Sequence, residues 1–229
     1  MKITILTPTR DRRRQNWSAL WERIQSQGTR TVVGPSGNEI YVCHGAGDYT
    51  GLNWHIIQSP EDSDSGRRIF TEAGVTFHHP PSLPGHADSY EKWNWFVDNE
   101  VKGEPGSYIH MLADDDLIPA DFYYNFLNGE RGPVTITSMY RGQNTVGFHE
   151  NTPLIAQPEN MVCGKIGMEQ FIFEEDFAKS CIRFDTRDGF EDGKMGERLA
   201  LEFPKSVVYR PDLAVYFNAM EVGRWNVVP

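Results

Sequence analysis

Apolar and polar side chains alternate along residues 2–7, and β-branched residues predominate there, which predicts a first strand. Pro8 and Asp11 end this pattern, and apolar residues then recur at helical spacing. These helix-spaced residues are Trp17, Leu20, Trp21 and Ile24. Further strands are predicted at 39–43, 74–78 and 108–113, the last after a helix at 90–97. Alternating strands and helices predict an α/β fold with a mostly parallel sheet and helices on its faces.

The pattern changes after Gly132, where strands are no longer separated by long helices. A segment rich in glycine and asparagine follows the first predicted strand of this half, and Glu191 and Asp192 precede its one predicted helix. The predicted strands are 133–139, 165–173, 206–209 and 213–217, and the predicted helix is 194–201. We therefore expect an α+β extension of the same sheet rather than an independent domain.

Three consecutive aspartates, Asp114, Asp115 and Asp116, directly follow the apolar segment 108–113. In a parallel sheet this places carboxylates at the carboxyl end of a strand, where such sheets bind ligands. Neighbouring carboxylates repel one another unless a cation lies among them, and Mg²⁺ and Mn²⁺ prefer oxygen ligands. The triplet therefore predicts a divalent metal site, although an isolated acidic triplet is also typical of a solvated turn.

Composition narrows the class of protein. A formal net charge of -10 over 229 residues argues against general nucleic-acid binding, which needs clustered Lys and Arg. The one basic cluster, Arg10 with Arg12–Arg14, fits either a bound anion or a solvated helix start. The three cysteines are widely spaced, so we expect reduced thiols rather than disulfides or a zinc site.

No apolar run approaches the ~18 residues that a membrane-spanning helix needs. The basic residues near the start follow the apolar segment, whereas a secretory signal places them first. The expectation is a soluble, cytoplasmic protein. Residues 58–68 are polar enough to predict a mobile surface loop.

Five short segments, in order, carry a resemblance to a known family. The opening "ITILTPTRDR" is similar to "IIIPTYNR", and "MLADDDLIP" at 111–119 is similar to "LDDDD-x-x-x-P", the so-called DXD motif. Residues 38–48 are similar to "EIIVVDDGSxD", and 187–199 to "ED-x-x-L-x-x-R-L". Residues 74–97 are similar to the region around "N-x-G-x-x-x-A-R-N". Together the segments resemble the GT-A fold glycosyltransferases, particularly the family-2 type.

The resemblance implies one GT-A domain over 1–229, with a nucleotide-sugar-binding half at 1–118 and an acceptor-binding half at 119–229. It implies Asp192 as the catalytic base, with Glu191 beside it, and Asp114 and Asp116 as metal ligands. The implied donor-binding residues are Thr7, Pro8, Thr9, Arg10, His44, Asp48, His79, Asp114 and Asp115. A helix dipole is expected to favour the ionised form of Asp192, although Glu191 and Asp192 are also typical helix caps.

Two departures from the family pattern affect the donor site. His44 stands where members usually carry an aspartate that holds the nucleotide base, with Asp48 as a substitute. The helix before the aspartates lacks the usual arginine, and Trp93–Asn94 is its nearest equivalent. Trp54 and Trp225 fall in segments expected to be irregular, where they could stack on a sugar, whereas His110 is expected to be a hydrogen-bonded core histidine.

The function implied by the resemblance is metal-dependent transfer of a sugar, a hexosyl group first of all, from a nucleotide-diphosphate donor to an acceptor hydroxyl. We expect Mn²⁺ or Mg²⁺, a UDP-sugar or else a GDP-sugar, a saccharide or other hydroxyl acceptor, inversion of configuration, and a viral or bacterial origin. One alternative is a sugar nucleotidyltransferase, although "TPTRDRRR" has no glycine. Another is a non-catalytic nucleotide- or sugar-binding module of the same fold.

Overall fold

The computed structural model describes residues 2–9, 15–25, 27, 29–33, 39–43, 52–59, 71, 74–83, 88–119, 121–141, 153–185, 191–217, 220–221 and 224–225. A seven-stranded sheet in the order β5-β4-β1-β6-β8-β7-β9 forms its centre. Its strands are β1 (Ile3–Pro8), β4 (Leu52–Ile57), β5 (Thr76–His78), β6 (Tyr108–Met111), β7 (Val134–Arg141), β8 (Phe171–Glu174) and β9 (Val207–Phe217).

All strands of this sheet except β8 run in one direction. β1 pairs in parallel with β4 and β6, β4 with β5, and β7 with β9, whereas β8 is antiparallel to both of its neighbours. The carboxyl ends of six strands therefore meet at one edge of the sheet. The predicted mostly parallel α/β sheet is confirmed.

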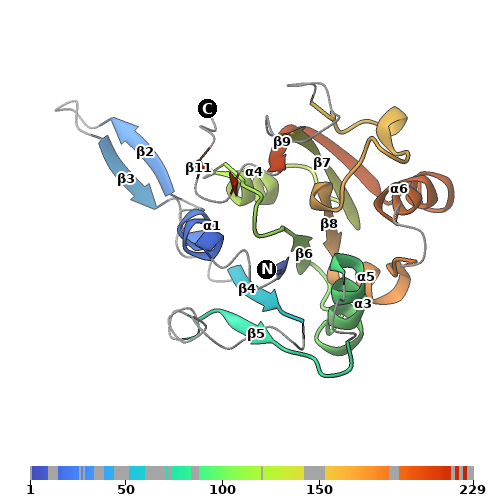
Figure 1. Cartoon of the computed structure of the whole chain (residues 1–229). Helices are drawn as coiled ribbons and strands as arrows, with labels where there is room; N and C mark the ends of the chain where they lie inside the picture. Colours follow the sequence, from blue (N-terminus) through green and yellow to red (C-terminus); the bar gives the residue numbers. More distant parts are fainter. Residues whose placement is uncertain are drawn as a thin grey trace.

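Helices cover both faces of the sheet (Figure 1), and the sheet separates two apolar clusters, one under the helices of each face. On one face lie α1 (Gln15–Gln25) and α4 (Phe122–Asn128), which pack through residues such as Trp17 and Phe122. On the other lie α3 (Ser89–Asn99), α5 (Glu175–Cys181) and α6 (Glu191–Glu202). Two short 3-10 helices, η2 (Pro158–Asn160) and η3 (Met168–Gln170), lie in the segment that connects β7 to β8.

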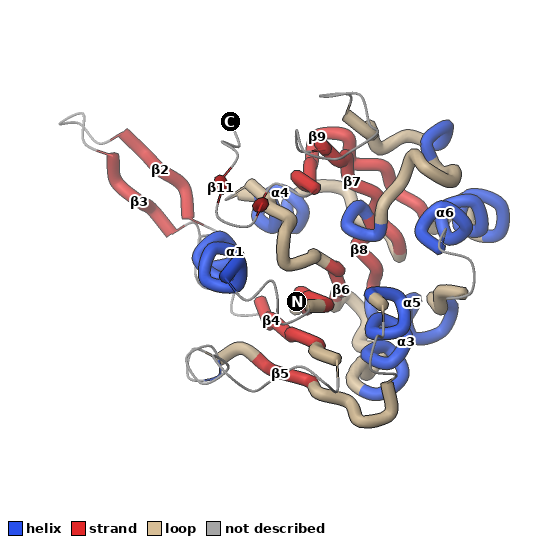
Figure 2. The backbone as a smooth tube through the Cα atoms, in the orientation of Figure 1, coloured by secondary structure: helices blue, strands red, loops and turns tan. Residues whose placement is uncertain are grey.

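The strand predicted at 39–43 forms, but it does not join the central sheet. It is β3 (Glu39–Cys43), which pairs only with β2 (Thr29–Val33) in an antiparallel hairpin that extends away from the sheet (Figures 1 and 2). The strand beside β1 is instead β4, in a segment that the sequence pattern left irregular. The resemblance of 38–48 to the family's second strand was therefore wrong, because that place in the sheet belongs to 52–57.

Three further details differ from the sequence pattern. The two strands predicted at 206–209 and 213–217 are one strand, β9 (Val207–Phe217), and a register shift interrupts its pairing with β7. Most of the strand predicted at 165–173 is irregular or 3-10 helix, and α5 follows it unpredicted. Gln58 and Ser59 are buried rather than part of a surface loop, while 60–68 lie outside the described residues.

The chain beyond β9 adds a small hairpin of β10 (Met220–Glu221) and β11 (Arg224–Trp225), so Trp225 lies on a strand. Within the described ranges, every helix is too short or too polar to cross a bilayer.

Candidate active site

The aspartate triplet forms a tight turn directly after β6. Asp114 and Asp116 are fully buried and Asp115 nearly so, which excludes a solvated acidic turn. The Asp116 amide donates to the Ala113 carbonyl over 3.2 Å, and the Ala113 amide donates to the Asp116 carboxylate over 3.1 Å. These two bonds close the turn and fix the direction of the Asp116 side chain.

The end of β1 is held next to this turn by indole and hydroxyl groups. The Thr9 hydroxyl donates to the Asp114 carboxylate and accepts from Nε1 of Trp17 over 3.1 Å. The Thr7 hydroxyl accepts from Nε1 of Trp54 over 2.9 Å. Trp54 is therefore a buried part of β4 rather than an exposed sugar platform, because its ring fixes the neighbouring strand.

A buried lysine, Lys92, approaches the same strand end from α3. Its Nζ donates to the Thr9 carbonyl over 2.8 Å, and its side chain is almost completely buried. It places an amino group at Thr9, the residue that bonds to Asp114, in the helix where the sequence pattern had left the family's arginine unassigned. Trp93 and Asn94, the nearest equivalents of that arginine in the sequence, have structural roles. Trp93 is buried in the core, and Asn94 bonds to the backbone of Phe184.

Asp192 lies in the first turn of α6 and is largely shielded from water. Its Oδ1 accepts the Gly193 amide over 2.7 Å, and the Tyr90 hydroxyl also hydrogen-bonds to it. Burial raises the pKa of Asp192 above its usual range, and the nearby Glu191 adds to this, while the hydrogen bonds from Gly193 and Tyr90 oppose it. The amides at the start of α6 do favour the ionised form of Asp192, but burial outweighs them, and the net shift of the pKa is upward.

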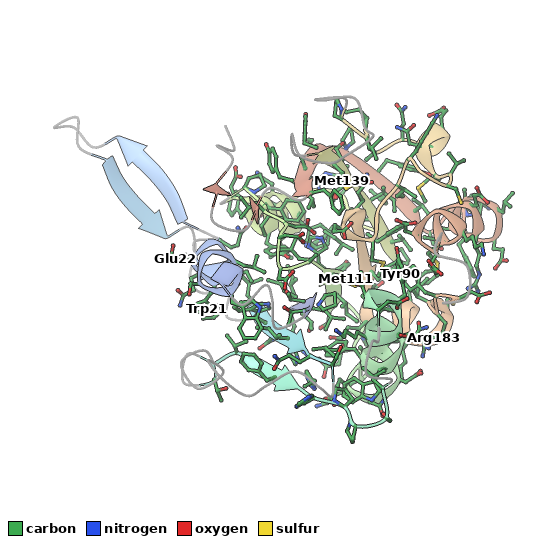
Figure 3. All side chains as sticks on the ribbon, viewed as in Figure 1. Trp21, Glu22, Tyr90, Met111, Met139 and Arg183 are labelled. Carbon is green, nitrogen blue, oxygen red and sulfur yellow. The ribbon has the colours of Figure 1, made fainter. Side chains whose placement is uncertain are left out.

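Two contacts fix Asp192 from outside its own helix. Residues 161–164 pack so closely on α6 that a Cβ at Gly193 would lie 2.4 Å from Cα of Cys163. Tyr90, which Figure 3 labels at the α3 side of the sheet, has its ring centroid 5.2 Å from that of Phe184. Phe184 is held in turn by Asn94, whose side chain bonds to both its amide and its carbonyl at 2.9 and 2.8 Å.

The histidines divide between core and sheet edge. His110 is buried and bonded to the Tyr123 hydroxyl and the Glu169 carbonyl, each over 2.8 Å, so the predicted core role is confirmed. His79 is partly buried just beyond β5, which keeps it near the donor edge. The remaining predicted donor residues, Arg10, His44 and Asp48, lie outside the described residues, as does the first part of the segment 187–199, residues 187–190.

The fit of a metal ion rests on the carboxylates of the turn. Among the residues that the structure describes, no three His, Cys, Asp or Glu side chains converge as a ligand group. The hydrogen bonds from Thr9 and Ala113 engage one oxygen each of Asp114 and Asp116. Mg²⁺ at phosphate sites is commonly bound by only one or two carboxylates plus substrate oxygens, and Mn²⁺ accepts the same ligands, so the oxygen donors of the turn fit such an ion.

Comparison with known proteins supports the fold. No family model matches the sequence, and no curated protein matches it either. Among solved structures, TarS of S. aureus superposes with a TM-score of 0.60 and 12% identity, over 95% of this chain and 36% of that one. The mannosyltransferase PcManGT of Pyrobaculum calidifontis, in complex with GDP-Man and Mn²⁺, gives a TM-score of 0.55 and 13% identity, over 97% of this chain and 58% of that one.

Both structures are GT-A glycosyltransferases, and this chain has the GT-A fold that its sequence motifs predicted. The chain spans about a third of the length of the first and just over half of the second. At these identities the likeness concerns the fold.

Proposed function

We propose that this chain is a glycosyltransferase that moves a sugar from a nucleotide-diphosphate donor to an acceptor hydroxyl, with Asp192 as the general base. The observation that carries the proposal is the presence, on one GT-A sheet, of a buried aspartate turn after β6 and a half-buried, hydrogen-bonded Asp192 at the start of α6. The raised pKa of Asp192 suits it to accept a proton, since a base works best with a pKa near the working pH.

The reaction would be a single displacement. Asp192 takes the proton of the acceptor hydroxyl as the acceptor oxygen bonds to the anomeric carbon. The bond from that carbon to the donor diphosphate breaks, and the diphosphate leaves with its electron pair. Attack opposite the leaving group inverts the anomeric configuration. Burial keeps the pKa of the base raised, and the charge of Glu191 adds to this.

The donor half is proposed to be residues 1–118. The ends of β1 and β4 lie side by side there, with Thr7, Pro8 and Thr9 on one strand and Gln58 directly after the other. Because β4 occupies the place of the family's second strand, we assign the contact with the nucleotide base to Gln58 and Ser59. His79 lies just beyond the adjoining strand β5. As the donor we propose a UDP-sugar before a GDP-sugar.

The leaving diphosphate needs positive charge. Lys92 holds an ammonium group at the Thr9 carbonyl, next to the aspartate turn. Asp114 and Asp116 would hold Mn²⁺ or Mg²⁺, which supplies Lewis-acid stabilisation of the diphosphate when bound. Asp115, between them, is proposed to contact the donor.

The donor assignment can be tested by thermal unfolding with UDP, GDP, CMP and dTDP, each with and without Mn²⁺. A nucleotide at ~100-fold over its dissociation constant stabilises the folded protein by about 2.7 kcal/mol. A shift with one nucleotide that needs Mn²⁺ is expected, and the dependence on Mn²⁺ should disappear in Asp116→Ala. An equal shift with and without Mn²⁺ would refute the metal assignment.

The base assignment is tested by Asp192→Asn. The variant should bind the same nucleotide but lose transfer by at least about 100-fold, the usual contribution of a general base. Asp121→Asn is the matched control, because Asp121 is exposed and its side chain caps nothing at α4. Retained transfer by Asp192→Asn, or a product with retained configuration, would exclude this mechanism.

A further inference from the structure

Two tyrosines form an exposed stack near the ends of the last two strands of the sheet. Tyr140 of β7 and Tyr216 of β9 are register partners, with ring centroids 5.5 Å apart and ring planes inclined by 20°. Tyr140 is 40% exposed, and few other large apolar side chains in the described part of the chain reach that exposure. Two stacked rings on adjacent strands form a flat aromatic surface with hydroxyl groups at its rim, which marks the pair as a candidate contact for a ligand.

The stack is tied directly to the aspartate turn. Leu117, the residue after Asp116, forms an isolated antiparallel bridge with Tyr216. The Leu117 amide donates to the Tyr216 carbonyl over 3.0 Å, and the Tyr216 amide donates to the Leu117 carbonyl over 2.8 Å. The end of β9 therefore turns back over the segment that leaves β6, so the tyrosines and the aspartates share the carboxyl edge of the sheet.

The inner ring is supported by the core. Tyr216 is partly buried and packs against the apolar cluster that includes Leu117 and Val215. Burial raises the pKa of Tyr216, and Tyr140 adds to the shift, so its hydroxyl stays protonated and can donate a hydrogen bond. Tyr140 then lies against a fixed ring and offers aromatic surface and a hydroxyl to solvent. In Figure 3 the label of Met139, the residue before Tyr140, marks β7, and the label of Met111 marks the end of β6.

We propose that the Tyr140–Tyr216 stack is a binding platform for a sugar ring of the acceptor. A pyranose has a face of C–H bonds that packs on an aromatic ring, and hydroxyls at its rim that pair with phenol groups. The nucleotide is not the expected occupant, because β4 and β1 carry the donor edge and the stack lies on β7 and β9, beyond β6 and β8. The inference rests on the proposed transferase function and makes its acceptor a saccharide.

Saturation-transfer NMR with free sugars tests the platform without the donor. The probes are the methyl glycosides of glucose, galactose, mannose and N-acetylglucosamine at millimolar concentration. At least one should receive saturation, mainly at the C–H protons of one ring face. The signal should fall by about tenfold in Tyr140→Ala, and remain in Tyr140→Phe, which keeps the ring. Leu201→Ala is the matched control, because Leu201 is 82% exposed on α6, away from both strands.

The outcomes separate this proposal from the transferase proposal. No saturation of any probe by the wild-type protein, or an unchanged signal in a folded Tyr140→Ala variant, overturns the platform. Nucleotide-dependent thermal shifts test the donor site independently, so a failed donor site with intact sugar binding refutes only the transferase. If donor hydrolysis persists in Tyr140→Ala while transfer to the bound sugar falls, the platform serves the acceptor as proposed.

Discussion

The Thr9 hydroxyl donates a hydrogen bond to the carboxylate of Asp114, which joins the end of β1 to the turn after β6. The same hydroxyl accepts from the Trp17 indole, and the Thr9 carbonyl accepts from Lys92. One residue thereby connects a helix on each face of the sheet to the proposed donor edge. The direction of the Asp114 carboxylate depends on this arrangement.

Replacing Thr9 should show how much this connection stabilises the protein. Thr9→Val keeps the shape of the side chain but removes both hydroxyl bonds at a buried site, and should lower the free energy of unfolding by about 1–3 kcal/mol. Urea unfolding measures the loss. Thr9→Ser, which keeps the hydroxyl, should lose clearly less; equal losses in the two variants would show that the hydroxyl bonds do not matter.

The acid limb of the activity profile should report the pKa of Asp192. Because the base must be ionised and burial raises its pKa, kcat/KM should begin to fall at a higher pH than an ordinary aspartate would give. Tyr90→Phe removes a hydrogen bond that favours the carboxylate, so the limb should move to still higher pH. In this variant Glu191 still raises the pKa of Asp192, and the hydrogen bond from the Gly193 amide still lowers it.

The comparison needs a tyrosine variant that leaves Asp192 alone. Tyr124→Phe on α4, on the opposite face of the sheet, should keep the wild-type profile. An unshifted limb in Tyr90→Phe would mean that Tyr90 does not set the pKa of Asp192.

Stability should fall in mild acid because of His55 and His78. Their rings stack at 5.2 Å, and Nδ1 of His55 is 2.9 Å from Nε2 of His78, a hydrogen bond that requires a neutral ring. Burial, His78 and Lys2 lower the pKa of His55 to about 4, and burial lowers the pKa of His78 against the pull of Glu100. The unfolded chain then binds more protons below about pH 6.5, so stability is full above that pH and is lost towards about pH 4.

Urea unfolding at several pH values within that interval checks this expectation. His55→Phe retains an aromatic ring against Phe96 but cannot take up a proton, so its stability should depend less on pH. His110, whose pKa burial also lowers to about 4, contributes a similar dependence that remains in the variant. A pH dependence as steep as that of the wild type in His55→Phe would rule out the His55–His78 pair as its source.

Gly193 should be intolerant of a side chain. A Cβ there would lie 2.4 Å from the Cys163 backbone, so Gly193→Ala must push residues 161–164 away from α6. We expect a loss of about 1–3 kcal/mol in the free energy of unfolding and weaker transfer, because Asp192 is adjacent. A Cβ at Gly196, on the same helix, would lie 3.1 Å from a methyl of Ile166 and 3.4 Å from the Met161 backbone, so Gly196→Ala should be milder. Thermal unfolding of both variants checks the difference, and equal midpoints would contradict it.

The sequence pattern identified the elements with strong periodicity and missed those whose partners are distant. The strand 39–43 and the strand 52–57 both have high β-propensity, but only pairing with β1 distinguishes a sheet member from a hairpin, and pairing is not encoded locally. The motifs were assigned to the correct strands of the sheet where the apolar runs are long, as at β1 and β6. The net rise in the pKa of Asp192 could not be predicted from the sequence, because burial of a side chain depends on what packs over it, here residues 161–164 and Tyr90.

Lys92 shows the same limit within the candidate site. A lysine in an amphipathic helix is ordinarily solvated, so nothing in the sequence distinguishes it from an exposed one. Its burial follows from the approach of α3 to the end of β1, where the Thr9 carbonyl accepts a hydrogen bond from Nζ of Lys92. The aspartate triplet was identifiable because an apolar strand directly precedes it, whereas Tyr140 and Tyr216 are far apart in the chain and meet only through the β7–β9 register.

The register shift in β9 protects this protein from joining its sheet to that of another molecule. β9 is an edge strand, and a regular edge offers a continuous row of amides and carbonyls to any extended chain. Between Arg210 and Ala214 the residues Pro211–Leu213 have no register partner in β7, and Pro211 has no amide hydrogen. Arg210 bonds to Asp212 at 2.6 and 2.8 Å and to carbonyls of Asn125 and Glu130, each over 3.1 Å, which holds the bulge in place. This edge therefore resists aggregation by strand addition.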